Sequence, residues 1–168
     1  MATVTPVQIP RHKWGHYLNI TPAGGTPTLA RINLGSTDLS VSPNPETESQ
    51  HWIGEESGST YVKSYAPTID AEQIAYKGDP VFDFVFDIYW KRKILSDAET
   101  DYYEVLLFEE SSSGEYEAQK QRVCISVGTV AGPATDPVSI SYTINFMGDP
   151  TYGTLNPQTK TFNKTTPA

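Results

Sequence analysis

Alternating apolar and polar residues cover much of the chain and predict a protein built mainly from β-strands. The most regular alternation runs from Val138 to Phe146, with apolar residues at every second position. A period of two is typical of a strand with one buried face. The other face carries small uncharged residues, namely Ser139, Ser141, Thr143 and Asn145. We expect these four side chains to form a polar surface that is neither deep core nor ordinary charged exterior.

Glycine and proline divide the remaining pattern into short strands. The chain has 12 Gly and 13 Pro, spread along it as turn residues rather than gathered in one tract. We expect Gly148-Asp149-Pro150 to end the strand that reaches Phe146. The expected strands are, in order, Trp14–Ile20, Thr28–Leu34, Asp38–Val41, Glu46–Ile53, Ser59–Ile69, Tyr102–Phe108, Tyr116–Val127, Val138–Phe146 and Thr159–Asn163.

Residues 79–93 depart from this pattern and predict one helix. Asp79 is a good N-cap and Pro80 suits the first helical position. The cations at residues 91–93 suit the negative end of the helix dipole. A helix this apolar must lie across a sheet. The residues expected to form its packing face are Val81, Phe82, Val85, Ile88 and Tyr89.

The same segment also fits a strand. Phe82, Phe84 and Phe86 alternate with Asp83, Val85 and Asp87, and a run of aromatic residues is common in strands. We favour the helix because its start and stop signals lie at the correct positions.

The loop between two of the expected strands is polar, acidic and rich in glycine. Glu55 and Glu56 resist burial without cationic partners, and the glycines permit movement. We expect this loop to be mobile in an isolated subunit. Its residues are Gly54, Glu55, Glu56, Ser57, Gly58 and Ser59.

The length of 168 residues suits one domain. We expect an extended arm at residues 1–13, a single β-rich domain of α+β type at residues 14–163, and a frayed tail at residues 164–168. The only long apolar run, in the expected helix, carries two Asp, so we expect no membrane span. The N-terminus shows no charged stretch followed by an apolar one, so we expect no signal segment.

The net charge of −8 argues against a role in gripping nucleic acid or anionic lipid. The single Cys124 excludes an intramolecular disulfide framework. Basic residues cluster only at residues 11–13 and 91–93, and the second cluster already has an explanation at the helix end.

No catalytic or metal-binding pattern stands out, so we expect no enzyme activity, no cofactor and no metal. His12 and His16 are four residues apart, but Pro10 and Gly15 argue against the helix that such a pair requires. Residues 97–101 resemble the start of a calcium loop without its glycine or its final glutamate. Cys124 lies mid-strand and is interpreted as an inert thiol.

An ordered set of short motifs resembles a known family. The motifs are Tyr17-Leu18-Asn19, Asn44-Pro45-Glu46-Thr47-Glu48, Trp52-Ile53, Ser64-Tyr65-Ala66-Pro67, Gly78-Asp79-Pro80-Val81-Phe82-Asp83, Asp97-Ala98-Glu99-Thr100, the Val138–Phe146 strand, Gly148-Asp149-Pro150 and Gly153-Thr154. Together they resemble the major tail protein, or tail tube protein, of long-tailed bacteriophages, especially those of Gram-positive hosts. The resemblance covers roughly residues 14–163, and its specificity lies in the order of the motifs.

The resemblance implies an antiparallel β-sandwich or split barrel with one flanking helix, assembled into stacked hexameric rings. Such a tube is a virion component made in the host bacterial cytoplasm, and the genome is delivered through it. The implied partners are further copies of the chain, a tape measure protein in the lumen, transiting DNA without tight binding, and tail terminator and distal tail proteins at the tube ends. It also implies that the 54–59 loop reaches the next ring and that the polar strand face of residues 139–145 lines the lumen or a subunit contact.

Two other interpretations stay open on the sequence alone. One is another phage structural protein, such as a head-decoration or tail-terminator protein. The other is a carbohydrate-binding β-sandwich module, because Trp14, Trp52 and the 10 Tyr leave room for aromatic sugar platforms.

Overall fold

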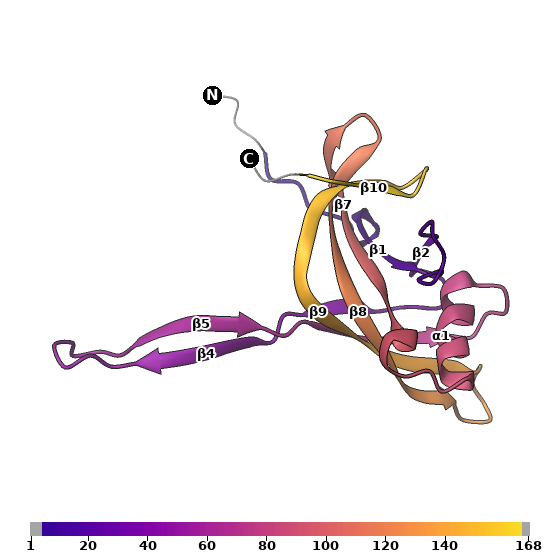
Figure 1. Cartoon of the computed structure of the whole chain (residues 1–168), viewed down its shortest axis with the longest axis horizontal. Coiled ribbons are helices and arrows are strands. Elements are labelled where there is room, and N and C mark those ends of the chain that lie inside the picture. Colours follow the sequence, from indigo (N-terminus) through magenta and orange to yellow (C-terminus); the bar gives the residue numbers. More distant parts are fainter. Residues whose placement is uncertain (1–4, 166–168) are drawn as a thin grey trace. The chain divides into compact units, whose positions relative to one another are not determined.

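The computed structural model describes residues 5–165 and contains ten β-strands and one α-helix, so the expected mainly β fold of α+β class is confirmed (Figure 1). The α-helix is α1 (Pro80–Trp90), and short 3₁₀ turns lie at Arg11–Lys13 and Leu95–Ala98. The strands are β1 (Trp14–Asn19), β2 (Leu29–Arg31), β3 (Leu39–Ser42), β4 (Pro45–Gln50), β5 (Ser59–Tyr65), β6 (Thr68–Ile74), β7 (Glu99–Ser112), β8 (Glu115–Ala131), β9 (Ser139–Asn156) and β10 (Thr161–Lys164).

Eight strands form one antiparallel sheet and the other two form a separate hairpin. The order in the main sheet is β2-β1-β7-β8-β9-β6-β3, with β10 paired to β9. The hairpin consists of β4 and β5. Among the described residues, none of the helices has the length and apolar character needed to cross a membrane.

The chain divides into two compact units. The first unit comprises the residues up to 32 together with 100–122 and those from 148 onward, and the second comprises 33–99 and 123–147. Strands β8 and β9 contribute residues to both units. The single domain expected over residues 14–163 stays a prediction. In the first unit, Tyr17, Leu29, Tyr103, Val105 and Leu155 pack together as a buried cluster.

The helix interpretation of residues 79–93 is confirmed, and its beginning lies where the capping signals placed it. The Asp79 carboxylate accepts a hydrogen bond from the Phe82 backbone N–H at 2.8 Å, and Pro80 is the first helical residue. The helix ends at Trp90, earlier than residue 93, and the Lys91 backbone N–H closes its last turn on the Asp87 carbonyl at 3.1 Å.

The expected packing face of the helix divides in two. Val81, Val85 and Ile88 are buried in the second unit. Phe82 is only half-buried, and Tyr89 is 43% exposed. The buried stripe is therefore narrower than the apolar stripe of the sequence.

Several strand boundaries differ from the expectation, and two of these differences are large. The expected strand Ser59–Ile69 is two strands, because Pro67 offers no N–H for pairing and separates β5 from β6. The strand expected to stop before Gly148-Asp149-Pro150 instead continues to residue 156. Gly148 takes a positive φ of 65° there, a conformation that costs glycine little. Its carbonyl accepts a hydrogen bond from Gln121 Nε2 at 2.6 Å.

Candidate functional site

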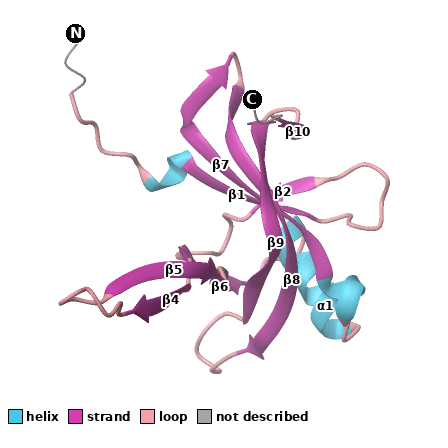
Figure 2. Cartoon of the chain, turned by 60° about the vertical axis from the view of Figure 1, so that its left-hand side comes forward, coloured by secondary structure: helices cyan, strands magenta, loops and turns pink. Residues whose placement is uncertain are grey.

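The β4–β5 hairpin lacks a core of its own. Thirteen residues make up the two strands, and all are exposed except the half-buried Gln50. Figure 2 shows the pair as a two-stranded ribbon. Lys63 Nζ lies 3.9 Å from the Glu46 carboxylate, and Ser49 and Thr60 share a hydroxyl hydrogen bond of 2.8 Å. Because such exposed contacts contribute little and an isolated hairpin is marginal in water, this ribbon is suited to being covered by a partner.

The hairpin tip, defined here as residues 51–58, is both acidic and apolar. Of the six residues expected in the loop, Gly54 to Gly58 lie in this tip and Ser59 begins β5. His51 Nε2 donates to the Glu55 carbonyl at 2.7 Å, and the Glu55 N–H donates to the Trp52 carbonyl at 3.0 Å. Trp52 is 60% exposed and Ile53 is fully exposed.

Sequence reasoning missed these two apolar residues as part of the tip, because it assigned them to a strand ending at Ile53. The available signal was Gly54, after which no alternation continues. An exposed apolar pair directly before a polar turn indicates a contact surface rather than a core.

A second exposed apolar group lies at the C-terminal end of α1. Phe82, Phe86 and Trp90 are stacked along the helix with ring centroids 5.7 Å apart at each step. Trp90 is 71% exposed, and after the helix Ile94 is 69% and Leu95 is 79% exposed. These residues continue the apolar stripe of the helix beyond what the second unit buries.

The polar strand face of residues 139–145 is half-buried, and its side chains form hydrogen bonds with neighbouring residues. The Ser141 and Thr129 hydroxyls are 2.6 Å apart, and the Thr143 hydroxyl donates to Asp70 at 2.8 Å. Asn145 Nδ2 donates to the Ser126 hydroxyl at 3.2 Å. The remaining member, Ser139, donates to the Ala131 carbonyl at 3.3 Å. This face is a small, uncharged polar surface, and its role in a lumen or subunit contact stays a prediction.

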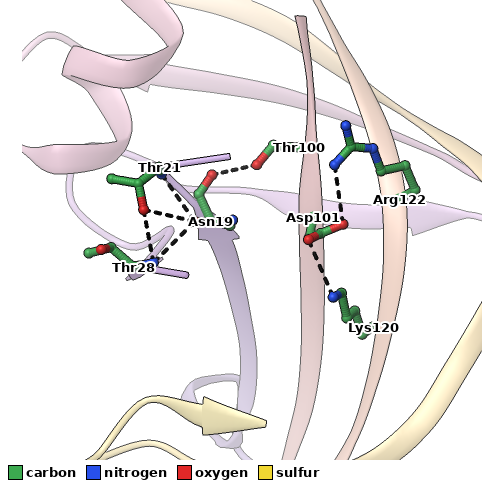
Figure 3. Close-up of polar contacts among 7 residues, drawn as sticks. All are labelled: Asn19, Thr21, Thr28, Thr100, Asp101, Lys120 and Arg122. Atoms are coloured by element: carbon green, nitrogen blue, oxygen red, sulfur yellow. Dashed lines mark hydrogen bonds and ion pairs between the residues drawn. The ribbon is translucent and has the colours of Figure 1, made fainter. Parts of the chain in front are cut away.

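Asn19 holds the loop that connects β1 to β2 (Figure 3). Its buried Oδ1 accepts hydrogen bonds from the Thr21 backbone N–H at 3.0 Å and from the Thr28 backbone N–H at 3.1 Å. Its backbone carbonyl also accepts from the Thr100 hydroxyl. Figure 3 also shows Asp101, which pairs with Lys120 at 3.4 Å and Arg122 at 3.6 Å across β7 and β8.

Replacing Asn19 by Ala is expected to lower the free energy of unfolding by about 1–3 kcal/mol, because the Thr21 and Thr28 N–H groups lose their shared acceptor. Urea titration followed by circular dichroism measures the loss. Asn33→Ala is the matched control, because the Asn33 side chain is exposed and accepts a hydrogen bond from the adjacent Leu34 N–H. Equal losses in the two variants would contradict a loop-holding role for Asn19.

His16 is buried in the first unit and is not brought together with His12, which is exposed. The Arg11 guanidinium donates to His16 Nε2 at 3.1 Å, so Nδ1 carries the proton and donates to the Tyr102 hydroxyl. The pKa of His16 is lowered from 6.5 to about 4. Burial is the largest cause, and the positive charges of Arg11 and Arg31 follow. Among the described residues, no group of His, Cys, Asp and Glu is placed to hold a metal ion.

We expect His16 to make the protein less stable in mild acid. Its pKa is lower in the folded state, so the unfolded chain binds the extra proton first. The stabilisation is complete above pH 6.5 and is lost as the pH falls to about 4, by at most about 1.4 kcal/mol per pH unit. Urea titrations at pH 4 to 7 should show a shallower dependence in His16→Gln. His12→Ala is the control and should retain the wild-type slope; a wild-type slope in His16→Gln would refute the assignment.

A cleft of about 500 Å³ lies in the first unit. Trp14 and Tyr152 supply aromatic walls, and Glu104, Glu117 and Gln119 supply polar groups. Trp14 Nε1 donates to the Glu104 carboxylate at 2.6 Å, and Gln119 donates to the same carboxylate. These contacts hold the glutamate in place as an acceptor.

Comparison with known proteins identifies the fold. The chain is similar to a chain in the tail of an empty GTA particle obtained by helical refinement with C6 symmetry, with a TM-score of 0.63 and 13% identity. That match covers 86% of this chain and 98% of the other. The chain is also similar to the cap that terminates the tube of the anti-feeding prophage, with a TM-score of 0.50, 11% identity, and coverage of 92% and 96%. No family model and no curated protein sequence matches.

Proposed function

We propose that this protein is a structural, non-enzymatic subunit of a phage-type tail tube. The observation that carries the proposal is its fold, which it shares over 86% of its length with a chain of a C6-symmetric particle tail. The second similar structure is the cap of a tube. Two neighbours from tube assemblies support a role in self-association rather than in catalysis, and they support a place in the virion.

In the proposed assembly, six copies form a ring and rings stack into the hollow conduit through which the genome is delivered. The net charge of −8 suits such a conduit, since an acidic chain does not hold DNA tightly. The tape measure protein in the lumen during assembly, and tail terminator and distal tail proteins at the ends, belong to the same proposal. Long-tailed phages of Gram-positive hosts are the proposed source, with synthesis in the bacterial cytoplasm.

Two surfaces are assigned within this proposal. The hairpin tip, which contains Glu55 and Glu56, makes the contact between rings, because it is exposed and the β4–β5 ribbon has no core. The polar strand face of residues 139–145 faces the lumen or a neighbouring subunit. Its hydroxyl and amide groups are uncharged, so they neither bind nor repel phosphate strongly.

Negative-stain electron microscopy of the purified protein at high concentration tests the proposal. Hollow rods or six-fold rings are the expected result, and light scattering should report masses far above 18.5 kDa. A protein that stays monomeric at all concentrations tested would overturn the proposal.

The cleft of the first unit favours a second candidate function, the binding of carbohydrate. Aromatic walls from Trp14 and Tyr152 beside the oriented Glu104 carboxylate are the groups that sugar-binding sites use. A sugar-binding module stays monomeric, and Trp14→Ala would abolish its binding to a glycan panel. A tube subunit assembles and binds none of the glycans.

A further inference from the structure

The first of two complementary surfaces is the helix-end patch, defined as Trp90 and residues 91–95. Trp90, Ile94 and Leu95 together form an exposed apolar group. Trp90 stacks on Phe86, which holds its ring along the helix although the residue is 71% exposed. An aromatic ring whose orientation is already fixed loses little conformational entropy when a partner covers it.

The helix-end patch has a basic rim. Lys91 Nζ lies 2.8 Å and Lys93 Nζ lies 2.7 Å from the two oxygens of Asp87. These contacts hold both ammonium groups beside the aromatic end of the helix. With the exposed Arg92, the three cations outnumber Asp87 and the exposed Asp97, whose backbone N–H bonds the Ile94 carbonyl at 3.1 Å, and leave this rim with a net charge of +1.

The second surface is the hairpin tip, and it matches the patch in both respects. Its exposed apolar residues are Trp52 and Ile53. Its carboxylates are Glu55 and Glu56, both exposed, which give the tip a charge of −2 with His51 neutral. The turn bonds of His51 and Glu55 hold the apolar pair and the acids on one short segment.

We propose that the hairpin tip of one copy docks on the helix-end patch of a second copy. This inference rests on the proposed function and names the surface that receives the inter-ring hairpin. Charge complementarity favours the hairpin tip as the segment that covers the helix-end patch, because the tip is acidic and the patch is basic. The tip brings two large apolar residues, and the patch offers three exposed apolar residues. Because both surfaces are exposed within one chain, neither covers the other there, and the proposed contact is between copies. Two different surfaces joined in this way form a heterologous contact, which propagates from subunit to subunit.

Cysteine cross-linking tests the contact directly. In a Cys124→Ser background, Ile53→Cys and Leu95→Cys proteins are prepared separately, mixed and oxidised. A disulfide-linked heterodimer is expected to form at least about tenfold more than with Val138→Cys in place of Leu95→Cys. Val138 is also exposed, at 51%, and lies outside the patch. Equal cross-linking of the two mixtures, or none, would overturn the inference whether or not tubes are present.

Charge exchange gives a second, independent measurement. Glu56→Arg and Arg92→Glu, each alone, are expected to reduce polymer yield in pelleting assays by at least about tenfold, and combining them in one chain should restore most of it. Lys77→Glu is the control, an exposed cation before α1 that is expected to leave the yield unchanged. Single variants that polymerise like wild type would show that another protein or another surface receives the tip. In that case the inference fails while tube formation by the wild type still supports the proposed function. A specific cross-link without rings or tubes would leave the contact in place and overturn the tube proposal.

Discussion

A chain whose hairpin tip, residues 51–58, is replaced by the two-residue turn Asn-Gly is expected to fold normally and to form no long tubes. Gln50 and Ser59 are paired across the hairpin, so a two-residue turn of type I′ joins them without changing the register. All eight residues of the tip are exposed, Trp52 and Ile53 included. Its removal should therefore change the free energy of unfolding by no more than about 0.5 kcal/mol.

The expected assembly effect is large because, in the proposed tube, every subunit would lose its contact with the next ring at the same time. Electron microscopy measures tube length, and urea titration verifies the fold. A second variant, in which residues 51–58 become an eight-residue Gly-Ser linker, keeps the loop length and removes the side chains. It is expected to behave like the short variant. Tubes of wild-type length from either variant would show that the tip is only a surface connection.

Val85→Asp is expected to give the largest loss of stability, about 3–5 kcal/mol or more, because it removes a fully buried apolar side chain and buries a charge. Phe82→Asp should cost less, since Phe82 is only half-buried. Asp83→Asn is the matched control on the exposed side of the same helix; it removes one favourable charge from the first turn and should cost no more than about 1 kcal/mol.

Urea titrations followed by far-ultraviolet circular dichroism rank the three variants. The expected order of destabilisation is Val85→Asp, then Phe82→Asp, then Asp83→Asn. A Val85→Asp protein as stable as Asp83→Asn would contradict the packing of α1 in the second unit. Such a result would also contradict the explanation that α1 exposes aromatic residues at its C-terminal end because its buried stripe is narrower than its apolar stripe.

The class of the fold and the position of α1 follow from the sequence. Alternation with a period of two acts between nearest neighbours along a strand, so it marks strands wherever one face is buried. The helix start depends on Asp79 and Pro80, whose effects reach only about three residues. The acidic part of the hairpin tip was also predictable, because glycine and unpaired glutamate resist packing in nearly any context.

The tertiary structure alone decided which apolar residues are covered. Phe82, Val85 and Tyr89 all belong to the apolar face in the sequence, yet only Val85 is fully buried, since burial depends on the strands that reach that part of the helix. His16 acquires its low pKa from burial and from the charges of Arg11 and Arg31, and it bonds Tyr102, which is 86 residues away in the chain. For Trp52 and Ile53 the adjacent Gly54 marks where the alternation ends, but only the tertiary structure shows that the pair is exposed. Such distinctions depend on contacts between segments distant in sequence, whereas the local signals act over a few residues.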